Sequence, residues 1–179
     1  MPISRSDSKR YRKLGNARKP LKYMVLSHHH SDHLAGVPEA IALGATLVTT
    51  PMTIQTLQQD ETLEAAKFQS LSGKTTLGPV ELYVIDTNHV VEMAIGYLPE
   101  QKVLYQDDHY SNTSKNSVAR VNQSDLVMQS RVNALGLKVD WLMSGHSRKA
   151  ERWSDFEAAA AKTFLGDICP NDRRICKQQ

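Results

Sequence analysis

The sequence predicts a layered α/β protein in which short buried strands alternate with helices. Three observations support this fold class. Apolar runs rich in β-branched residues alternate with helical patterns along the chain. A β-α-β pattern covers residues 21–50. Histidines and aspartates directly follow several of the apolar runs, and loops after strands are where such folds bind ligands.

The β-α-β pattern begins with a buried strand over residues 21–27 and ends with a β-rich run over residues 45–50. A short helix is predicted between them over residues 36–44. Pro38 lies in its first turn, where a missing N–H costs nothing, and Gly44 is well placed to end it. Two strands joined by such a helix are expected to be parallel neighbours.

The middle of the chain is predicted to form one helix and three strands. The helix covers residues 52–59, with a further helical or irregular piece through Phe68, and Gly73-Lys74 marks a turn. The strands are expected at residues 80–85, 93–98 and 102–106. Pro99 suits the connection between the last two strands, which predicts a hairpin.

The C-terminal part is predicted to contain a surface loop, a helix, a strand and a second helix, over residues 111–122, 124–135, 139–143 and 154–165. Ser124 is expected to cap the first helix, and Gly136 to close it. Ser154 followed by Glu157 has the spacing of a capping box, which predicts the start of the second helix.

Length and composition predict an ordinary globular protein. The chain has 179 residues, of which 40% are hydrophobic and 23% are charged. No apolar run is long enough to span a bilayer, and the N-terminus lacks the hydrophobic segment of a signal peptide. We therefore expect a cytoplasmic protein without a membrane partner. Cys169 and Cys176 could pair or stay as thiols, and their spacing does not decide between these states.

The charge is unevenly distributed. Residues 1–22 carry eight Lys or Arg and one Asp, a balance of +7, whereas the rest of the chain has a balance of −4. We expect residues 1–20 to form a basic polar arm and residues 21–179 to form the functional domain. A solvated chain end is the favoured interpretation of the arm. Contact with nucleic acid or an acidic surface is the alternative.

The segment His28-His29-His30-Ser31-Asp32-His33 is the most informative part of the sequence. Residues two apart on an extended segment point the same way, so His28 and His30 can reach one metal ion. Asp32 and His33 come after the strand has turned and can reach a neighbouring position. Imidazole and carboxylate are ligands that zinc accepts. A stray histidine run is the weaker interpretation, because the segment lies between a strand and a helix.

Further ligand-type residues follow later strands. These are His89, Asp108 and His146. If the loops that follow the strands converge on one edge, five histidines and two aspartates meet there. That number of side chains can hold two metal ions.

This pattern of His28-x-His30-x-Asp32-His33, His89, Asp108 and Gly145-His146 resembles the metallo-β-lactamase superfamily of metal-dependent hydrolases. The resemblance covers about residues 21–165 and implies an αββα sandwich. It implies that His28, His30 and His89 hold one metal, that Asp32, His33 and His146 hold a second, and that Asp108 bridges the two. Asp107 competes for the bridging role. His29 is expected to face away, and His109 to be an exposed histidine or a proton donor or substrate contact.

The resemblance also implies a reaction. Two zinc ions would share a bridging hydroxide, with Asp32 as the catalytic carboxylate that accepts a proton or orients the hydroxide. Mn²⁺ and Fe²⁺ stay open as alternative metals. The expected substrate is a small-molecule ester, thioester, lactone or β-lactam. The alternatives are a nuclease of the same superfamily, favoured by the basic arm, and a truncated metal-binding relic. A diiron oxidoreductase is less favoured because His30 stands where such members tend to have a carboxylate.

The chain departs from the superfamily pattern before its first metal motif. Only 27 residues precede His28, and most of them are polar. We therefore expect an incomplete N-terminal sheet in a shortened member. An incomplete sheet exposes unpaired backbone at an edge strand, which predicts a homodimer or higher oligomer through that edge.

Overall fold

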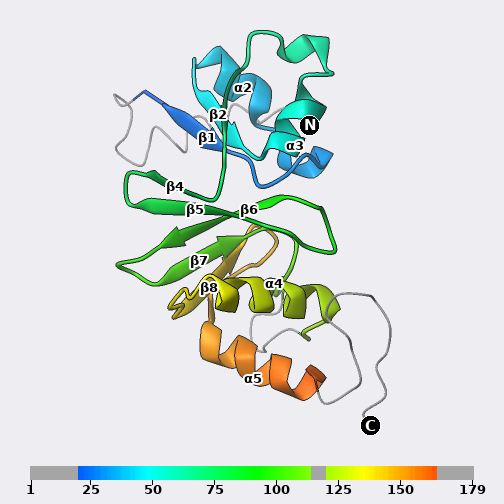
Figure 1. The fold of residues 1–179 in the computed structure, drawn as a ribbon, viewed down its shortest axis with the longest axis vertical. Helices are drawn as coiled ribbons and strands as arrows, with labels where there is room; N and C mark the ends of the chain where they lie inside the picture. The colour runs from blue at the N-terminus through cyan, green and yellow to red at the C-terminus, as the bar shows by residue number, and fades with distance from the viewer. Residues whose placement is uncertain (1–19, 114–119, 165–179) are drawn as a thin grey trace. The chain divides into compact units, whose positions relative to one another are not determined.

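The computed structural model describes residues 20–113 and 120–164 (Figure 1). The chain divides into two compact units, Met1–Leu71 (unit 1) and Ser72–Gln179 (unit 2). Each unit contains its own sheet and its own hydrophobic core. The predicted mixed α/β class is therefore confirmed. The basic arm and both cysteines lie outside the described residues, apart from Pro20.

Unit 1 is built on a three-stranded parallel sheet in the order β1-β2-β3. Its strands are β1 (Tyr23–Val25), β2 (Thr46–Thr49) and β3 (Lys67–Ser70). Its helices are α2 (Val37–Ala42) and α3 (Pro51–Leu57), with short 3₁₀ turns η2 (Ser31–His33) and η3 (Glu61–Leu63). The sequence predicts the β1-α2-β2 unit and its parallel pairing correctly.

Local sequence explains where the unit 1 helices begin and end. Pro38 lies in the first turn of α2, and Gly44 follows that helix with a positive φ of 76°, which favours glycine. Thr50 caps α3, because its side chain accepts a hydrogen bond from the backbone N–H of Thr53.

The core of unit 1 is made of aliphatic side chains from both the sheet and the helices. Its buried members are Leu26, Val37, Ala40, Ala45, Leu47, Leu57 and Leu63. Leu47 is fully buried on the central strand. Burying these side chains is the main source of stability for a small sheet covered by short helices.

Strand β3 corrects the sequence prediction. Residues through Phe68 are expected to be helical or irregular, but Lys67–Ser70 pairs with β2. Four residues carry too short a pattern to show their strand character alone. The parallel partner Thr46–Thr49 supplies hydrogen bonds that the local sequence does not reveal.

Unit 2 contains a six-stranded sheet in the order β4-β5-β6-β7-β8-β9. The strands are β4 (Lys74–Leu77), β5 (Val80–Ile85), β6 (Met93–Leu98), β7 (Val103–Gln106), β8 (Trp141–Ser144) and β9 (Glu151–Arg152). All neighbours are antiparallel except β7 and β8, which are parallel. Because β7 and β8 run the same way, the loops that follow them leave the sheet at the same edge.

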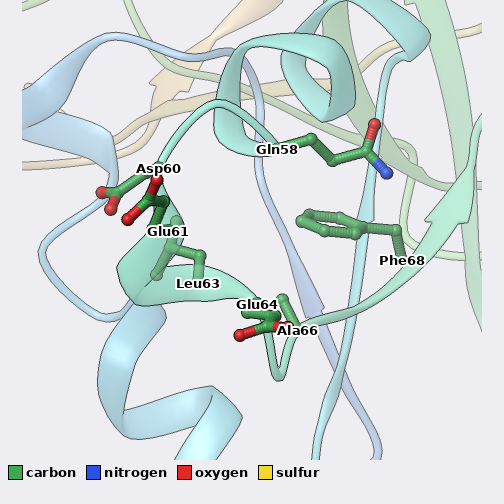
Figure 2. Close-up of a pocket in the computed structure, with 7 residues that line it drawn as sticks. All are labelled: Gln58, Asp60, Glu61, Leu63, Glu64, Ala66 and Phe68. Atoms are coloured by element: carbon green, nitrogen blue, oxygen red, sulfur yellow. The ribbon is translucent and has the colours of Figure 1, made fainter.

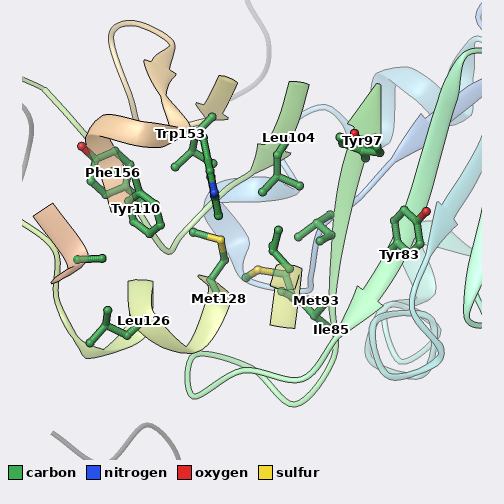
Figure 3. Packing of buried hydrophobic residues seen from close by; sticks show 14 of the residues in the cluster. Tyr83, Ile85, Met93, Tyr97, Leu104, Tyr110, Leu126, Met128, Trp153 and Phe156 are labelled. Carbon is green, nitrogen blue, oxygen red and sulfur yellow. The ribbon is translucent and has the colours of Figure 1, made fainter. Parts of the chain in front are cut away.

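Helices α4 (Gln123–Ala134) and α5 (Trp153–Phe164) contribute to one core with this sheet (Figure 3). Met128 of α4 and Phe156 of α5 are fully buried, together with Leu104 of β7. The ring of Phe156 meets that of Tyr110 edge to face, with centroids 5.0 Å apart. This core fixes the strands whose ends carry the polar residues described below.

The starts of both unit 2 helices differ from the prediction. Asn122, not Ser124, caps α4, and its side chain accepts from the N–H groups of Ser124 and Asp125. The Asp125 side chain accepts in return from the Asn122 N–H, which completes a capping box. Helix α5 already begins at Trp153, so Ser154 lies inside it.

Two further features of unit 2 are not expected from the sequence. Strands β4 and β9 are short and gain their hydrogen bonds from β5 and β8. The Ser- and Asn-rich segment 111–122 is predicted to be a surface loop, but Asn112 is buried with 1% exposure. Among the helices that the structure describes, none is both long and apolar enough to cross a membrane.

Candidate metal centre

The histidine-rich segment of unit 1 begins two residues after Leu26, a member of the unit 1 core. The backbone N–H of Leu26 still pairs with Val48 O at 3.0 Å, one residue beyond β1. Thr49 Oγ1 donates to Leu26 O at 2.9 Å, so the backbone of Leu26 is bonded through both its N–H and its carbonyl group. His28 is therefore delivered from a fixed strand end, and it is fully buried.

The rings of His28 and His30 lie close together. Their centroids are 4.5 Å apart, whereas the ring of His29 is 6.4 Å from His28 and 5.2 Å from His30. This is the arrangement expected of alternating side chains on an extended segment. His28 Nδ1 also lies 3.1 Å from Ser27 Oγ, a contact that helps to orient the imidazole.

The turn η2 brings the second pair of residues back toward the first. His30 has extended backbone angles and Asp32 and His33 lie in the 3₁₀ turn, with the His33 N–H bonded to His30 O at 3.0 Å. The ring of His33 is consequently 4.4 Å from that of His28. Asp32 and His33 form a contact of 3.4 Å between Oδ2 and Nε2. All four predicted residues of unit 1 are thus neighbours.

In unit 2 the carboxylate of Asp108 lies between two imidazoles. Its Oδ2 is 3.0 Å from His89 Nε2, and its Oδ1 is 2.7 Å from His146 Nε2. The two oxygens of one carboxylate therefore face different histidines. This is the geometry that a carboxylate shared by two cations requires.

Hydrogen bonds between the loops that follow β7 and β8 hold Asp108 near His146. Ser144 Oγ donates to Asp107 O at 2.8 Å, and the His146 N–H donates to the same hydroxyl at 3.1 Å. The Gly145 N–H reaches Gln106 O at 3.3 Å. The parallel pairing of the two strands therefore continues into the loops.

The neighbouring Asp107 has a different environment. Its Oδ1 accepts a hydrogen bond from Tyr105 OH at 2.7 Å. Burial and the Asp107 carboxylate together raise the pKa of Tyr105. Gly145 passes so close to Asp107 and Tyr105 that a Cβ would collide with the carboxylate. The geometry favours Asp108 over Asp107 as the shared carboxylate.

His109 is buried, contrary to the expectation that it is an exposed histidine. Its Nδ1 lies 2.7 Å from Ser124 Oγ in the first turn of α4. Its Nε2 has no hydrogen-bond partner among the residues that the structure describes. Burial lowers the pKa of His109 to about 4, so its ring is neutral at pH 7. His109 therefore connects the Asp108 loop to α4.

The His89 loop is organised by Thr87. The Thr87 hydroxyl donates to Val90 O at 2.9 Å and accepts from the N–H of His89 at 3.2 Å. Asp86 at the start of the loop forms an ion pair with Arg131 of α4 at 2.6 Å. Both loops that carry Asp108 and His89 are thus connected to the same helix.

A pocket of about 450 Å³ in unit 1 lies apart from the predicted ligands (Figure 2). It is lined by Gln58, Asp60, Glu61, Leu63, Glu64, Ala66 and Phe68. Asp60 already accepts hydrogen bonds from Thr62 N and Oγ1 at 2.9 and 2.6 Å, which lowers its pKa. None of the seven predicted site residues lines this pocket.

Sequence reasoning missed the residues that hold the loops in place. Thr87, Ser124 and Asn112 bind loops that carry His89, Asp108 or their neighbours. Ser124 and Asn112 are 15 and 35 residues away from their partners, and no sequence motif has such a spacing. Thr87 is only two residues from His89. A Thr at that spacing is the one local signal available.

Comparison with known proteins shows the same fold in metal-dependent enzymes. A model of the metallo-β-lactamase superfamily matches residues 3–54. The DIM-1 metallo-β-lactamase is 17% identical, with a TM-score of 0.66 over 92% of this chain and 79% of its own. A metallo-β-lactamase from Pontibacter korlensis is 17% identical, with a TM-score of 0.63 over 89% and 77% of the two chains. No curated protein sequence matches the chain.

The chain therefore has the metallo-β-lactamase fold. The αββα class expected from the resemblance is borne out by these structural neighbours. A flavodiiron protein from Giardia intestinalis shares the fold as well, at 18% identity and a TM-score of 0.63 over 90% of this chain and 46% of its own.

Proposed function

We propose that the chain is a hydrolase that binds two zinc ions through the seven ligand-type residues predicted from the sequence. The first subsite would contain His28, His30 and His89, and the second would contain Asp32, His33 and His146. Asp108 would belong to both. The observation that carries this proposal is the position of the Asp108 carboxylate between His89 and His146.

The chemistry of the donor set fits zinc. All seven residues offer an imidazole nitrogen or a carboxylate oxygen. Zinc accepts both donor types, and three protein ligands plus an open position are typical of a catalytic zinc. Mn²⁺ and Fe²⁺ accept the same donors, so the metal is part of the test.

The bound ions would lower the pKa of a water molecule toward about 7 and polarise the oxygen of a scissile carbonyl. The residues of the chain would do the remaining work. The Asp32 side chain is 60% exposed, so its carboxylate is able to exchange a proton with water while it also binds a metal ion. The hydrogen bond between neutral His109 and Ser124 would hold the Asp108 loop against α4.

We infer a small-molecule substrate with an ester, thioester, lactone or β-lactam bond. These bonds share a carbonyl carbon that hydroxide attacks and a carbonyl oxygen on which negative charge develops. The similar DIM-1 protein and the Pontibacter korlensis protein are described as metallo-β-lactamases, which makes a β-lactam the first compound to test.

The test is metal analysis combined with a substrate screen. Protein purified with zinc should contain about two ions per chain, because each subsite would have at least three protein ligands. Nitrocefin, a lactone and a thioester are then compared with a phosphodiester, and His146→Ala serves as the control. Fewer than one zinc per chain, or turnover that survives in His146→Ala, would refute the proposal. Two bound ions without turnover of any carbonyl compound would favour a metal-binding relic.

A nuclease is the second candidate, and the basic segment is the observation that favours it. Residues 1–22 carry a net charge of +7. Lysine and arginine contacts to phosphate make binding strongly dependent on salt. Cleavage of a phosphodiester, with affinity for RNA that falls steeply between about 50 and 200 mM salt, would support this function over carbonyl hydrolysis.

We also propose that the chain forms a homo-oligomer through strand β1. Among the described strands, β1 pairs only with β2, and its Tyr23 and Val25 are 45% and 43% exposed. An edge strand with apolar side chains favours pairing with a second copy. Light scattering at micromolar concentration should give at least a dimer, and Val25→Lys should shift the mass toward the monomer. A monomeric wild-type mass would refute this assignment.

A further inference from the structure

Asn112 connects the two loops of unit 2 that carry Asp108 and His146. Its backbone N–H donates to Ser147 Oγ at 2.8 Å, and its carbonyl oxygen accepts from the Arg148 N–H at 3.0 Å. Its side-chain Nδ2 donates to Glu151 Oε1 at 2.6 Å. Asn112 follows Asp108 by four residues, and Ser147 follows His146 directly. One residue thus makes two hydrogen bonds to the opposite loop and a third to β9, the strand that follows that loop.

The contact between Asn112 and Glu151 is shielded from water. The two residues are only 1% and 4% exposed. Lys149 Nζ lies 3.3 Å from Glu151 Oε1, and its side chain is 37% exposed. A hydrogen bond to a buried carboxylate is stronger than a neutral one. Breaking it leaves the buried Glu151 carboxylate with its Lys149 ion pair but without its hydrogen-bond donor, which is costly.

We propose that Asn112 and Glu151 are positioning residues that set the spacing between Asp108 and His146, and thereby the affinity of the second metal subsite. This inference rests on the proposed function. Asp108 and His146 approach within 2.7 Å from different loops, and the Asn112–Glu151 bond is a buried link between the segments that carry them. His89 leaves the sheet after β5 and does not depend on this link. The first subsite shares only Asp108 with this link, so it should depend on the link less than the second subsite does.

The test exploits the direction of the hydrogen bond. In Asn112→Asp the donor is replaced by a carboxylate that faces Glu151, and in Glu151→Gln the acceptor loses its charge. The double variant Asn112→Asp with Glu151→Gln restores a donor and an acceptor in the reverse order. The backbone hydrogen bonds of residue 112 stay available in all three proteins.

Binding of Co²⁺ to metal-free protein is followed by its visible absorption, one equivalent at a time. We expect Asn112→Asp to weaken the second equivalent by about 10-fold or more, a size typical of residues that orient ligands, with the first equivalent changed less than about 3-fold. The double variant should recover most of the loss. Thermal unfolding of the metal-free proteins shows separately whether Asn112→Asp only destabilises the fold.

The outcomes separate this inference from the proposed function. If wild-type protein binds fewer than two Co²⁺ ions, both are wrong. If it binds two ions and Asn112→Asp weakens both equally or neither, the positioning role is wrong and the two-metal site stands. Failure of the double variant to regain second-site affinity would also overturn the positioning role.

Discussion

The two units present their ligand-type side chains in different ways. In unit 1 the four residues come from one short segment, and a single 3₁₀ turn folds the second pair back on the first. In unit 2 His89, Asp108 and His146 come from three loops that follow β5, β7 and β8. A local motif carries its own geometry, whereas a dispersed group depends on strand pairing and on the core. The two groups should therefore respond differently to mutation.

The largest effect is expected from the dispersed group. Asp108→Asn should reduce hydrolysis by at least about 10³-fold, because loss of a bound ion removes several kcal/mol of transition-state stabilisation. Zinc content should fall with it. Asp107→Asn is the matched control, since its carboxylate accepts from Tyr105. Its effect should stay near 10-fold, as is usual for residues that support a site. Equal losses in the two variants would contradict the assignment of Asp108.

The cores should differ in their sensitivity as well. Phe156 lies at the centre of the larger core in unit 2, so Phe156→Ala should lower the free energy of unfolding by about 3–5 kcal/mol. Leu47→Ala in the smaller core of unit 1 should cost about 2–5 kcal/mol. Both tryptophans lie in unit 2, so their fluorescence reports on its unfolding in urea. A larger shift of the tryptophan transition for Leu47→Ala than for Phe156→Ala would contradict this comparison.

The local motif offers a matched pair of neighbours. His28→Ala should remove about one zinc per chain and slow hydrolysis by about 10²-fold or more, because a direct ligand is lost. His29→Ala should change turnover less than about 3-fold, since the ring of His29 lies farther from those of both neighbours. Metal analysis of the two variants checks the difference. A similar loss of zinc in both would show that alternation does not govern this segment.

The smallest effect concerns pH and lies away from the predicted ligands. Burial raises the pKa of Asp125 to about 6, although the Asn122 N–H donates to its carboxylate. The native state therefore binds more protons than the unfolded state between about pH 4 and 6, and stability falls as pH rises through that range. Asp125→Asn should reduce this loss of unfolding free energy by about 1–2 kcal/mol. Urea unfolding at pH 4.5 and 7 measures it, and an unchanged difference would refute the assignment.

Much of the fold was predictable because its signals are local. Pro38 and Gly44 bound α2, and the alternating residues of β5 to β7 are readable without a partner. Strands β3, β4 and β9 were not predictable, because two to four residues carry too little pattern and depend on their neighbours. The N-cap of α4 was misassigned by two residues, since Asn122 and Ser124 are both good caps.

The candidate site was predictable to the level of residue types and strand ends. The alternation of His28 and His30 and the position of Asp108 follow from strand geometry. The burial of His109 and Asn112 does not, because it arises from contacts with α4 and with the segment that ends in β9. Polar residues in a Ser- and Asn-rich stretch suggest exposure, and only the packed structure reveals the exception.

Gly145 has a consequence for laboratory evolution of this chain. A Cβ at that position would meet the carboxylate of Asp107 and the hydroxyl of Tyr105, so a larger residue requires those side chains to move. A library that randomises the loop after β8 should therefore be enriched in glycine at position 145. Selections for a new substrate should therefore vary the loop at positions other than Gly145, which directly precedes His146.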